Sequence, residues 1–112
     1  TAKLAVVYED GLAVNLTYGI LRARYRDGYA NSRLLNLNEV YEYTIKLNPI
    51  GCMLKPGQRL RLYVSSSDFP NFDRNHNNGE DYWSDSELRV AHQQVFHSAD
   101  RASHILLPVI PS

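Results

Sequence analysis

Alternation of apolar and polar residues is the feature that most restricts how this chain can fold. In residues 59–65, for example, leucine and valine alternate with arginine, tyrosine and serine. A period of two matches a β-strand, because successive strand side chains point to opposite faces of a sheet. We predict strands at the runs 21–26, 40–47, 59–65, 88–97 and 104–109, the last of them apolar on both faces. Residues 1–7 also read as a strand.

Turn-forming residues separate these runs. They are Asp10-Gly11, Asp27-Gly28, Asn48-Pro49, Lys55-Pro56-Gly57-Gln58 and Asn78-Gly79. Such residues supply the backbone conformations that tight turns need. Helical periodicity never persists for a dozen residues, although residues 50–54 could form one short turn. Short strands without intervening helices predict an all-β fold, an antiparallel sandwich or barrel, in a single domain spanning residues 1–112.

One long connection breaks this rhythm. Residues 65–86 show no strand pattern but contain the aromatic residues Phe69, Phe72, Tyr82 and Trp83 among Asn, Asp, Pro and Gly. A connection of about twenty residues is uncommon in a compact domain unless it is functional or packed on something. We therefore expect this segment to be packed.

Charge and cysteine content exclude several classes of partner. The chain has 12 basic and 12 acidic residues, so its net charge of zero argues against a nucleic acid or an anionic membrane. No apolar run is long enough to span a bilayer. The single cysteine, Cys52, excludes an internal disulfide and gives no reason to expect an oxidising compartment. The location is therefore left open, with the cytoplasm favoured.

Catalytic and metal-binding patterns are not found in the sequence. A serine nucleophile usually sits in a G-x-S-x-G turn, which this chain lacks, and residues 65–67 read as a polar strand end. His92 and His97 are five apart and would point to opposite faces of a strand. Residues 73–84 fail the EF-hand pattern, because Asn78 stands where glycine is needed and Ser84 where glutamate is needed. We expect no catalytic residue, no metal and no cofactor.

Five segments, in order along the chain, carry a family resemblance. They read GILRARYRD (19–27), EVYEYTI (39–45), KPGQRLRL (55–62), SSSDFPNFDRN (65–75) and HILLPVIP (104–111). Together they resemble the C-terminal domain of the cocaine-esterase and X-Pro dipeptidyl-peptidase family of serine hydrolases. Their co-occurrence over nearly the whole chain is far more specific than any one of them.

This resemblance implies a jelly-roll β-sandwich, similar to galactose-binding-like domains, that follows an α/β-hydrolase catalytic domain. The catalytic Ser, Asp and His of such enzymes lie upstream, so this chain would be a non-catalytic piece of a larger esterase, acylase or dipeptidyl-peptidase. The chain starts without Met, and the family pattern has one or two strands before Thr1. Their absence would leave an unpaired sheet edge through which the fragment could self-associate.

The aromatic connection is where we expect a functional surface. We predict that Phe69, Phe72 and Arg74 pack on the sandwich or on the catalytic domain, while Asp73 and Asn75 hold the loop through backbone hydrogen bonds. Alternatively, the loop only covers its own core. A second function stays open, that of a carbohydrate-binding jelly-roll module, with Tyr82 and Trp83 as sugar-stacking rings.

Overall fold

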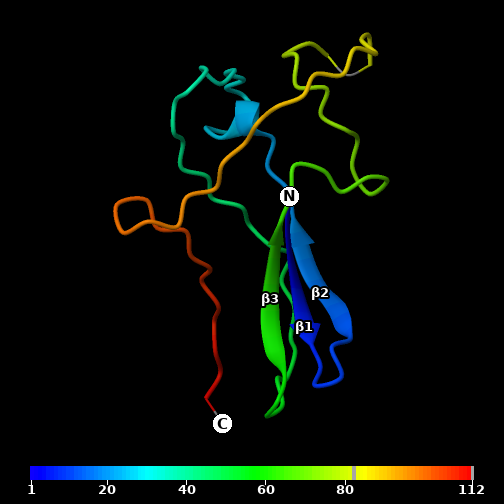
Figure 1. Ribbon diagram of the computed structural model, residues 1–112, viewed down its shortest axis with the longest axis vertical. Coiled ribbons are helices and arrows are strands. Elements are labelled where there is room, and N and C mark those ends of the chain that lie inside the picture. Colours follow the sequence, from blue (N-terminus) through cyan, green and yellow to red (C-terminus); the bar gives the residue numbers. More distant parts are fainter. Residues whose placement is uncertain (82, 112) are drawn as a thin grey trace.

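The computed structural model describes residues 1–81 and 83–111. Three strands form one open antiparallel sheet: β1 (Ala2–Val7), β2 (Ala13–Gly19) and β3 (Arg59–Val64), in the order β2-β1-β3. A single-turn 3-10 helix, η1 (Ala23–Tyr25), follows β2 (Figure 1). The regular structure is thus almost entirely strand, which confirms the all-β class. No helix of the described residues is long and apolar enough to cross a membrane.

β1 and β2 form a hairpin. Its turn lies at the predicted Asp10-Gly11 site, where the Gly11 amide donates to the Tyr8 carbonyl at 3.0 Å. Gly11 has a φ of +89°, a backbone conformation that glycine adopts without a steric penalty. β2 is absent from the predicted runs, although its residues Val14, Leu16 and Tyr18 do alternate with polar neighbours.

β3 pairs with the other side of β1, so the sheet joins segments far apart in the sequence. The register places Leu4 opposite Leu62 and Val6 opposite Leu60. The predicted strand at 59–65 is confirmed. The predicted turn before β3 is also formed, and in it the backbone amide of Gln58 donates to the Lys55 carbonyl at 3.1 Å.

The buried core is small and lies on the central strand. The buried hydrophobic residues of the described chain are Ala2, Leu4, Ala5, Val6 and Val7, all in β1. Residues 45–48 run beside the end of β2, where the hydroxyl of the buried Thr17 donates to the Asn48 carbonyl at 2.7 Å. A Cβ at Gly19 would collide with the carbonyl oxygen of Lys46. Glycine at this position therefore permits a close approach of two backbones.

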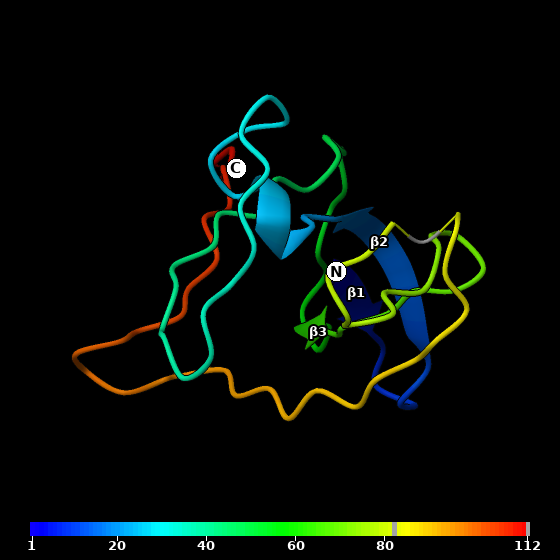
Figure 2. The same cartoon turned by 90° about the horizontal axis from the view of Figure 1, so that it is seen from above.

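Four predicted strands are not formed in the described chain. Residues 21–26 turn through η1 instead of extending, because Arg26 folds back so that its guanidinium donates to the Ala23 and Arg33 carbonyls. The runs 40–47, 88–97 and 104–109 follow irregular paths, and the last two lie apart from the sheet (Figures 1 and 2). A strand needs a neighbour to pair its backbone amides and carbonyls, and alternation alone does not supply one. Residues 50–54 are not helical either.

The second sheet that a sandwich requires is not formed by the described residues, so the jelly roll remains a prediction. The chain exposes 9539 Å² of surface. A folded monomer of this size would expose about 6,300 Å². Many large apolar side chains outside β1 stay exposed and contribute to this difference.

Candidate functional site

The loop 65–75, which follows β3, is anchored to the sheet by one ion pair. The Lys3 ammonium lies 2.8 Å from the Asp68 carboxylate, which also accepts a hydrogen bond from the Asn71 amide at 3.3 Å. The Asp68 carbonyl accepts from the Phe72 amide at 3.2 Å. The hydrogen bond from Lys3, followed by that from Asn71, lowers the pKa of Asp68 below its ordinary value. Asp68 therefore connects the loop to β1 through Lys3, and it also binds two residues of the loop itself, Asn71 and Phe72.

Two aromatic residues of this loop have different environments. The ring of Phe72 is half-buried and meets the Tyr18 ring of β2 edge-on, with the ring centres 6.0 Å apart. Phe69 remains 59% exposed, and the Arg74 guanidinium lies over it at 4.8 Å from the ring centre. The peptide bond between Phe69 and Pro70 is cis. The loop thus packs on the sheet through Phe72 and presents the stacked Phe69–Arg74 pair to its surroundings.

The two predicted loop-ordering residues have separate positions. The side-chain oxygen of Asn75 accepts a hydrogen bond from the Asn77 amide at 3.1 Å, a local turn of the kind that asparagine favours. Asp73 instead lines a cleft.

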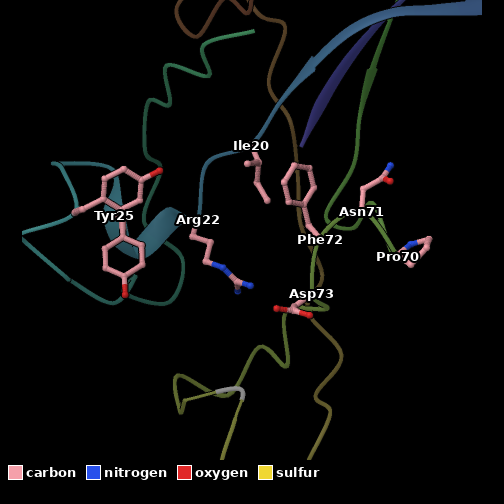
Figure 3. Close-up of a pocket in the computed structure, with 8 residues that line it drawn as sticks. Ile20, Arg22, Tyr25, Pro70, Asn71, Phe72 and Asp73 are labelled. Carbon is pink, nitrogen blue, oxygen red and sulfur yellow. The ribbon is translucent and has the colours of Figure 1, made fainter. Parts of the chain in front are cut away.

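This cleft, of about 400 Å³, lies between the loop and the segment that contains η1. Its lining residues are Ile20, Arg22, Tyr25, Tyr29, Pro70, Asn71, Phe72 and Asp73. In Figure 3 the Arg22 guanidinium points toward the Asp73 carboxylate, and Ile20 lies against the Phe72 ring. The rings of Tyr25 and Tyr29 lie 5.6 Å apart at a tilt of 44°. The cleft therefore combines aromatic walls with one cationic and one anionic group.

Arginines on the η1 segment connect this region to other loops. Arg24 donates to the Gly79 carbonyl at 2.9 Å and lies 4.0 Å from Asp81. The Arg26 guanidinium lies over the Tyr41 ring, 4.7 Å from its centre. The two arginine side chains therefore diverge and contact different loops.

The next loop, residues 76–89, has its own hydrogen bonds. The Arg89 amide donates to the His76 carbonyl at 2.9 Å, and the Asn78 side chain bonds both the Asp85 carboxylate and the Glu87 carbonyl. The Glu87 amide also donates to the Asp85 carboxylate at 3.0 Å. This bond, followed by that from Asn78, lowers the pKa of Asp85 below its ordinary value. Of the two predicted sugar-stacking rings, Trp83 lies on this loop and is 77% exposed, whereas Tyr82 lies outside the described residues.

The structure gathers Phe69, Phe72, Asp73 and Arg74 in one loop, as their spacing requires. Sequence reasoning missed Asp68, whose partner Lys3 lies 65 residues away. It also missed the contribution of Tyr25 and Tyr29 to the cleft. A strand at 21–26 would have directed Tyr25 elsewhere, and Tyr29 follows the Asp27-Gly28 turn, outside every predicted strand. Among the residues that the structure describes, no group of three or more His, Cys, Asp or Glu could hold a metal ion.

Comparison with known proteins gives the class of this domain. The chain belongs to the family of X-Pro dipeptidyl-peptidase C-terminal non-catalytic domains, whose model matches residues 1–106. This confirms the resemblance found in the five sequence segments.

A particular relative is the cocaine esterase of Rhodococcus sp. (strain MB1 Bresler). It is 38% identical over 112 residues, which cover 98% of this chain and 20% of the relative. The chain therefore spans about a fifth of the length of the curated relative it matches. No solved structure matches the chain.

Proposed function

We propose that this chain is the accessory domain of an X-Pro dipeptidyl-peptidase or acyl-ester serine hydrolase, and that it stabilises an upstream α/β-hydrolase domain of the same polypeptide. The family is non-catalytic by description, and the esterase relative is about five times as long as the match. The reaction, cleavage of an ester or amide bond, would belong to the upstream domain.

The observation that carries this proposal is the exposed apolar surface. Counting polar and apolar atoms together, the chain exposes roughly 3,200 Å² more than a folded monomer of its size. Many large apolar side chains are among the exposed residues. A standard interface takes only about 800 Å² from each partner. Side chains such as Leu106, Val109 and Ile110, each more than 80% exposed, would be an aggregation hazard in water unless a partner covered them.

The 65–75 loop is the part of this surface that we assign to the interface near the active site. Phe69 is exposed but already ordered by Arg74, so burying it would cost little additional side-chain entropy. The Lys3–Asp68 pair fixes the loop on the sheet. A pre-organised aromatic–arginine pair is typical of residues that dominate interface energies. Such a position would let the domain border the substrate entrance.

The test uses the native polypeptide that contains this chain. We expect Phe69→Ala to lower its melting temperature by several degrees, because about 2 kcal/mol of interface energy would be lost. Tyr8→Ala is the matched control, since Tyr8 lies next to the hairpin turn at the far end of the sheet and is 38% exposed. Equal melting temperatures for Phe69→Ala and the wild type would refute the assignment of this loop to the interface.

A second proposal concerns self-association through a sheet edge. Within the part of the chain that the structure describes, β3 pairs only with β1, and all six of its residues are exposed. One edge of the strand is therefore open to another strand. We expect the 112-residue chain to dimerise or aggregate at high concentration. Sedimentation that shows a stable monomer at every concentration would exclude this.

A further inference from the structure

We propose that the open edge of β3 binds an extended acidic strand, supplied by a part of the native polypeptide outside residues 1–112. The proposal rests on the accessory role described above and names the kind of segment that covers β3. Three features of β3 carry it: an edge without a partner strand, two arginines without a carboxylate partner on one face, and apolar side chains on the other face.

The edge of β3 has backbone groups available for pairing. In the described sheet β3 pairs with β1 alone (Figure 1). Alternate residues of an antiparallel strand direct their amide and carbonyl groups to one neighbour, and the residues between them direct theirs to the other side. The second set of β3 groups therefore has no partner strand in the described sheet. An extended segment can bind these groups by adding to the sheet as a further strand.

Two arginines make one face of this edge positive. The register sets Arg59 opposite Val7 and Arg61 opposite Ala5, and directly opposed residues share a face of the sheet. Both arginines are exposed, and no carboxylate of the described residues lies within 4.0 Å of their guanidinium nitrogens. Five other arginines do have a carboxylate within that distance: Arg24, Arg26, Arg33, Arg89 and Arg101.

Acidic groups near β3 do not neutralise this face. At one end of the strand the Asp68 carboxylate is bound by Lys3 at 2.8 Å. At the other end the Glu9 side chain lies beside Gly57, in the turn before β3. The positive charge of the two arginines is therefore left for a partner, and an anionic partner is the one it attracts.

The guanidinium of Arg61 is already positioned on the strand. It donates to the Tyr63 hydroxyl at 3.1 Å and lies over the Tyr63 ring, 5.8 Å from its centre. This contact uses one of its N–H donors, and a guanidinium has several in a fixed plane. A carboxylate on an added strand can bind the others, with less loss of side-chain entropy than a freely rotating arginine would suffer.

The opposite face of β3 sets the rest of the partner's pattern. Leu60, Leu62 and Val64 are 38%, 42% and 55% exposed. Successive residues of an added strand would face the two sides of the sheet in turn, so acidic residues opposite the arginines alternate with apolar residues opposite these three. Like charges directly opposite each other destabilise a strand pair, so a basic strand is disfavoured.

A strand from the same polypeptide is the occupant that we choose. The esterase relative is about five times as long as the match, so most of that relative lies outside this domain. A strand on the same polypeptide is present at a high effective concentration. Cross-strand pairs, which are weak individually, are then sufficient to hold it.

The experiment measures amide hydrogen exchange in the native polypeptide, resolved to single residues by fragmentation and mass spectrometry. We expect every amide of residues 59–64 to be protected, because each donates either to β1 or to the added strand. Arg61→Glu should make the amides that point away from β1 exchange at least about tenfold faster. High salt should speed their exchange in the wild type, because it screens the attraction between the strands.

Lys55→Glu is the matched control. It makes the same change of charge at an exposed position in the turn before β3, and it should change the exchange of residues 59–64 far less. Slow exchange of the β1 amides shows that each variant is folded. If Arg61→Glu loses that protection as well, Arg61→Gln repeats the test with a smaller perturbation.

Three results would overturn the proposal. One is fast exchange, in the wild type, of the β3 amides that point away from β1. Another is equally slow exchange in Arg61→Glu and the wild type, which would show that charge does not select the covering strand. The third is protection that grows with protein concentration, which would identify a second copy as the occupant. Failure of the acidic strand is distinguishable from failure of the accessory role, because the latter is measured by the melting temperature of Phe69→Ala.

Discussion

β1 and β3 are neighbouring strands of equal length whose environments are opposite. Both are rich in leucine and valine, and they face each other residue by residue, with Leu4 opposite Leu62. Five of the six residues of β1 are buried, whereas all six residues of β3 are exposed. The difference shows that burial follows from a strand's position in the sheet and from what covers it, and not from the hydrophobicity of its side chains alone.

The largest expected effect tests this contrast directly. Leu4→Ala should lower the free energy of unfolding by about 3 kcal/mol, because it leaves a cavity in the only buried strand of the described chain. Leu62→Ala, opposite in register and 42% exposed, should lower it by less than about 1 kcal/mol. Urea unfolding of the two variants provides the measurement, and equal losses would show that the two strands do not differ in burial.

The same pair sharpens the functional proposal when it is introduced into the native polypeptide. If an upstream domain covers β3, the cost of Leu62→Ala should rise toward that of Leu4→Ala, about 2 kcal/mol or more. If Leu62→Ala lowers the free energy of unfolding by the same amount in the 112-residue chain and in the native polypeptide, β3 is not part of the domain interface.

A somewhat smaller effect is expected at Gly19, where β2 ends beside residues 45–48. Gly19→Ala should destabilise the fold by about 2 kcal/mol, because the new methyl group would collide with the Lys46 carbonyl. Gly51→Ala is the matched control, since nothing lies within 4 Å of a Cβ at that position. Thermal unfolding followed by circular dichroism would measure both, and a Gly19→Ala variant as stable as Gly51→Ala would contradict this packing.

The smallest effect concerns acid. The hydrogen bonds from Lys3 and Asn71 hold the pKa of Asp68 below its ordinary value of about 3.9. The stabilisation from this group is therefore complete above that value, and it is lost as the pH falls through the lower pKa of the folded state. Asp68→Asn should be less stable than the wild type at neutral pH and lose less stability between pH 5 and pH 2, roughly. Glu42→Gln, at an exposed position, should follow the wild-type curve.

The sequence predicted strands in segments that pair with a neighbouring strand and also in segments that remain irregular. Residues 59–65 and 1–7 form strands because each finds a partner, whereas residues 88–97 alternate just as clearly and remain irregular. Turn positions were more predictable, since Gly11, Gly28, Gly57 and Gly79 all adopt positive φ. A turn is specified by a few adjacent residues, but a strand needs hydrogen-bond partners from distant ones.

In the candidate site, too, features set by adjacent residues were predictable, whereas features that need distant residues were not. The cluster of Phe69, Phe72 and Arg74 was visible in the sequence because the three residues are close along the chain. Asp68 pairs with Lys3, and Asp73 lines the same cleft as Arg22. Neither juxtaposition follows from local spacing.

By itself, the sequence determined the all-β class, the turns at glycine, and membership of a non-catalytic domain family, because these properties depend on local residues and on the order of motifs. Only the tertiary structure decided which alternating runs became strands, that the buried hydrophobic side chains of the described residues all lie in β1, and that Tyr25, from a predicted strand, lines a cleft instead. Those outcomes depend on pairing between distant segments, where the entropy of closing each loop must be offset by contacts that no single segment contains.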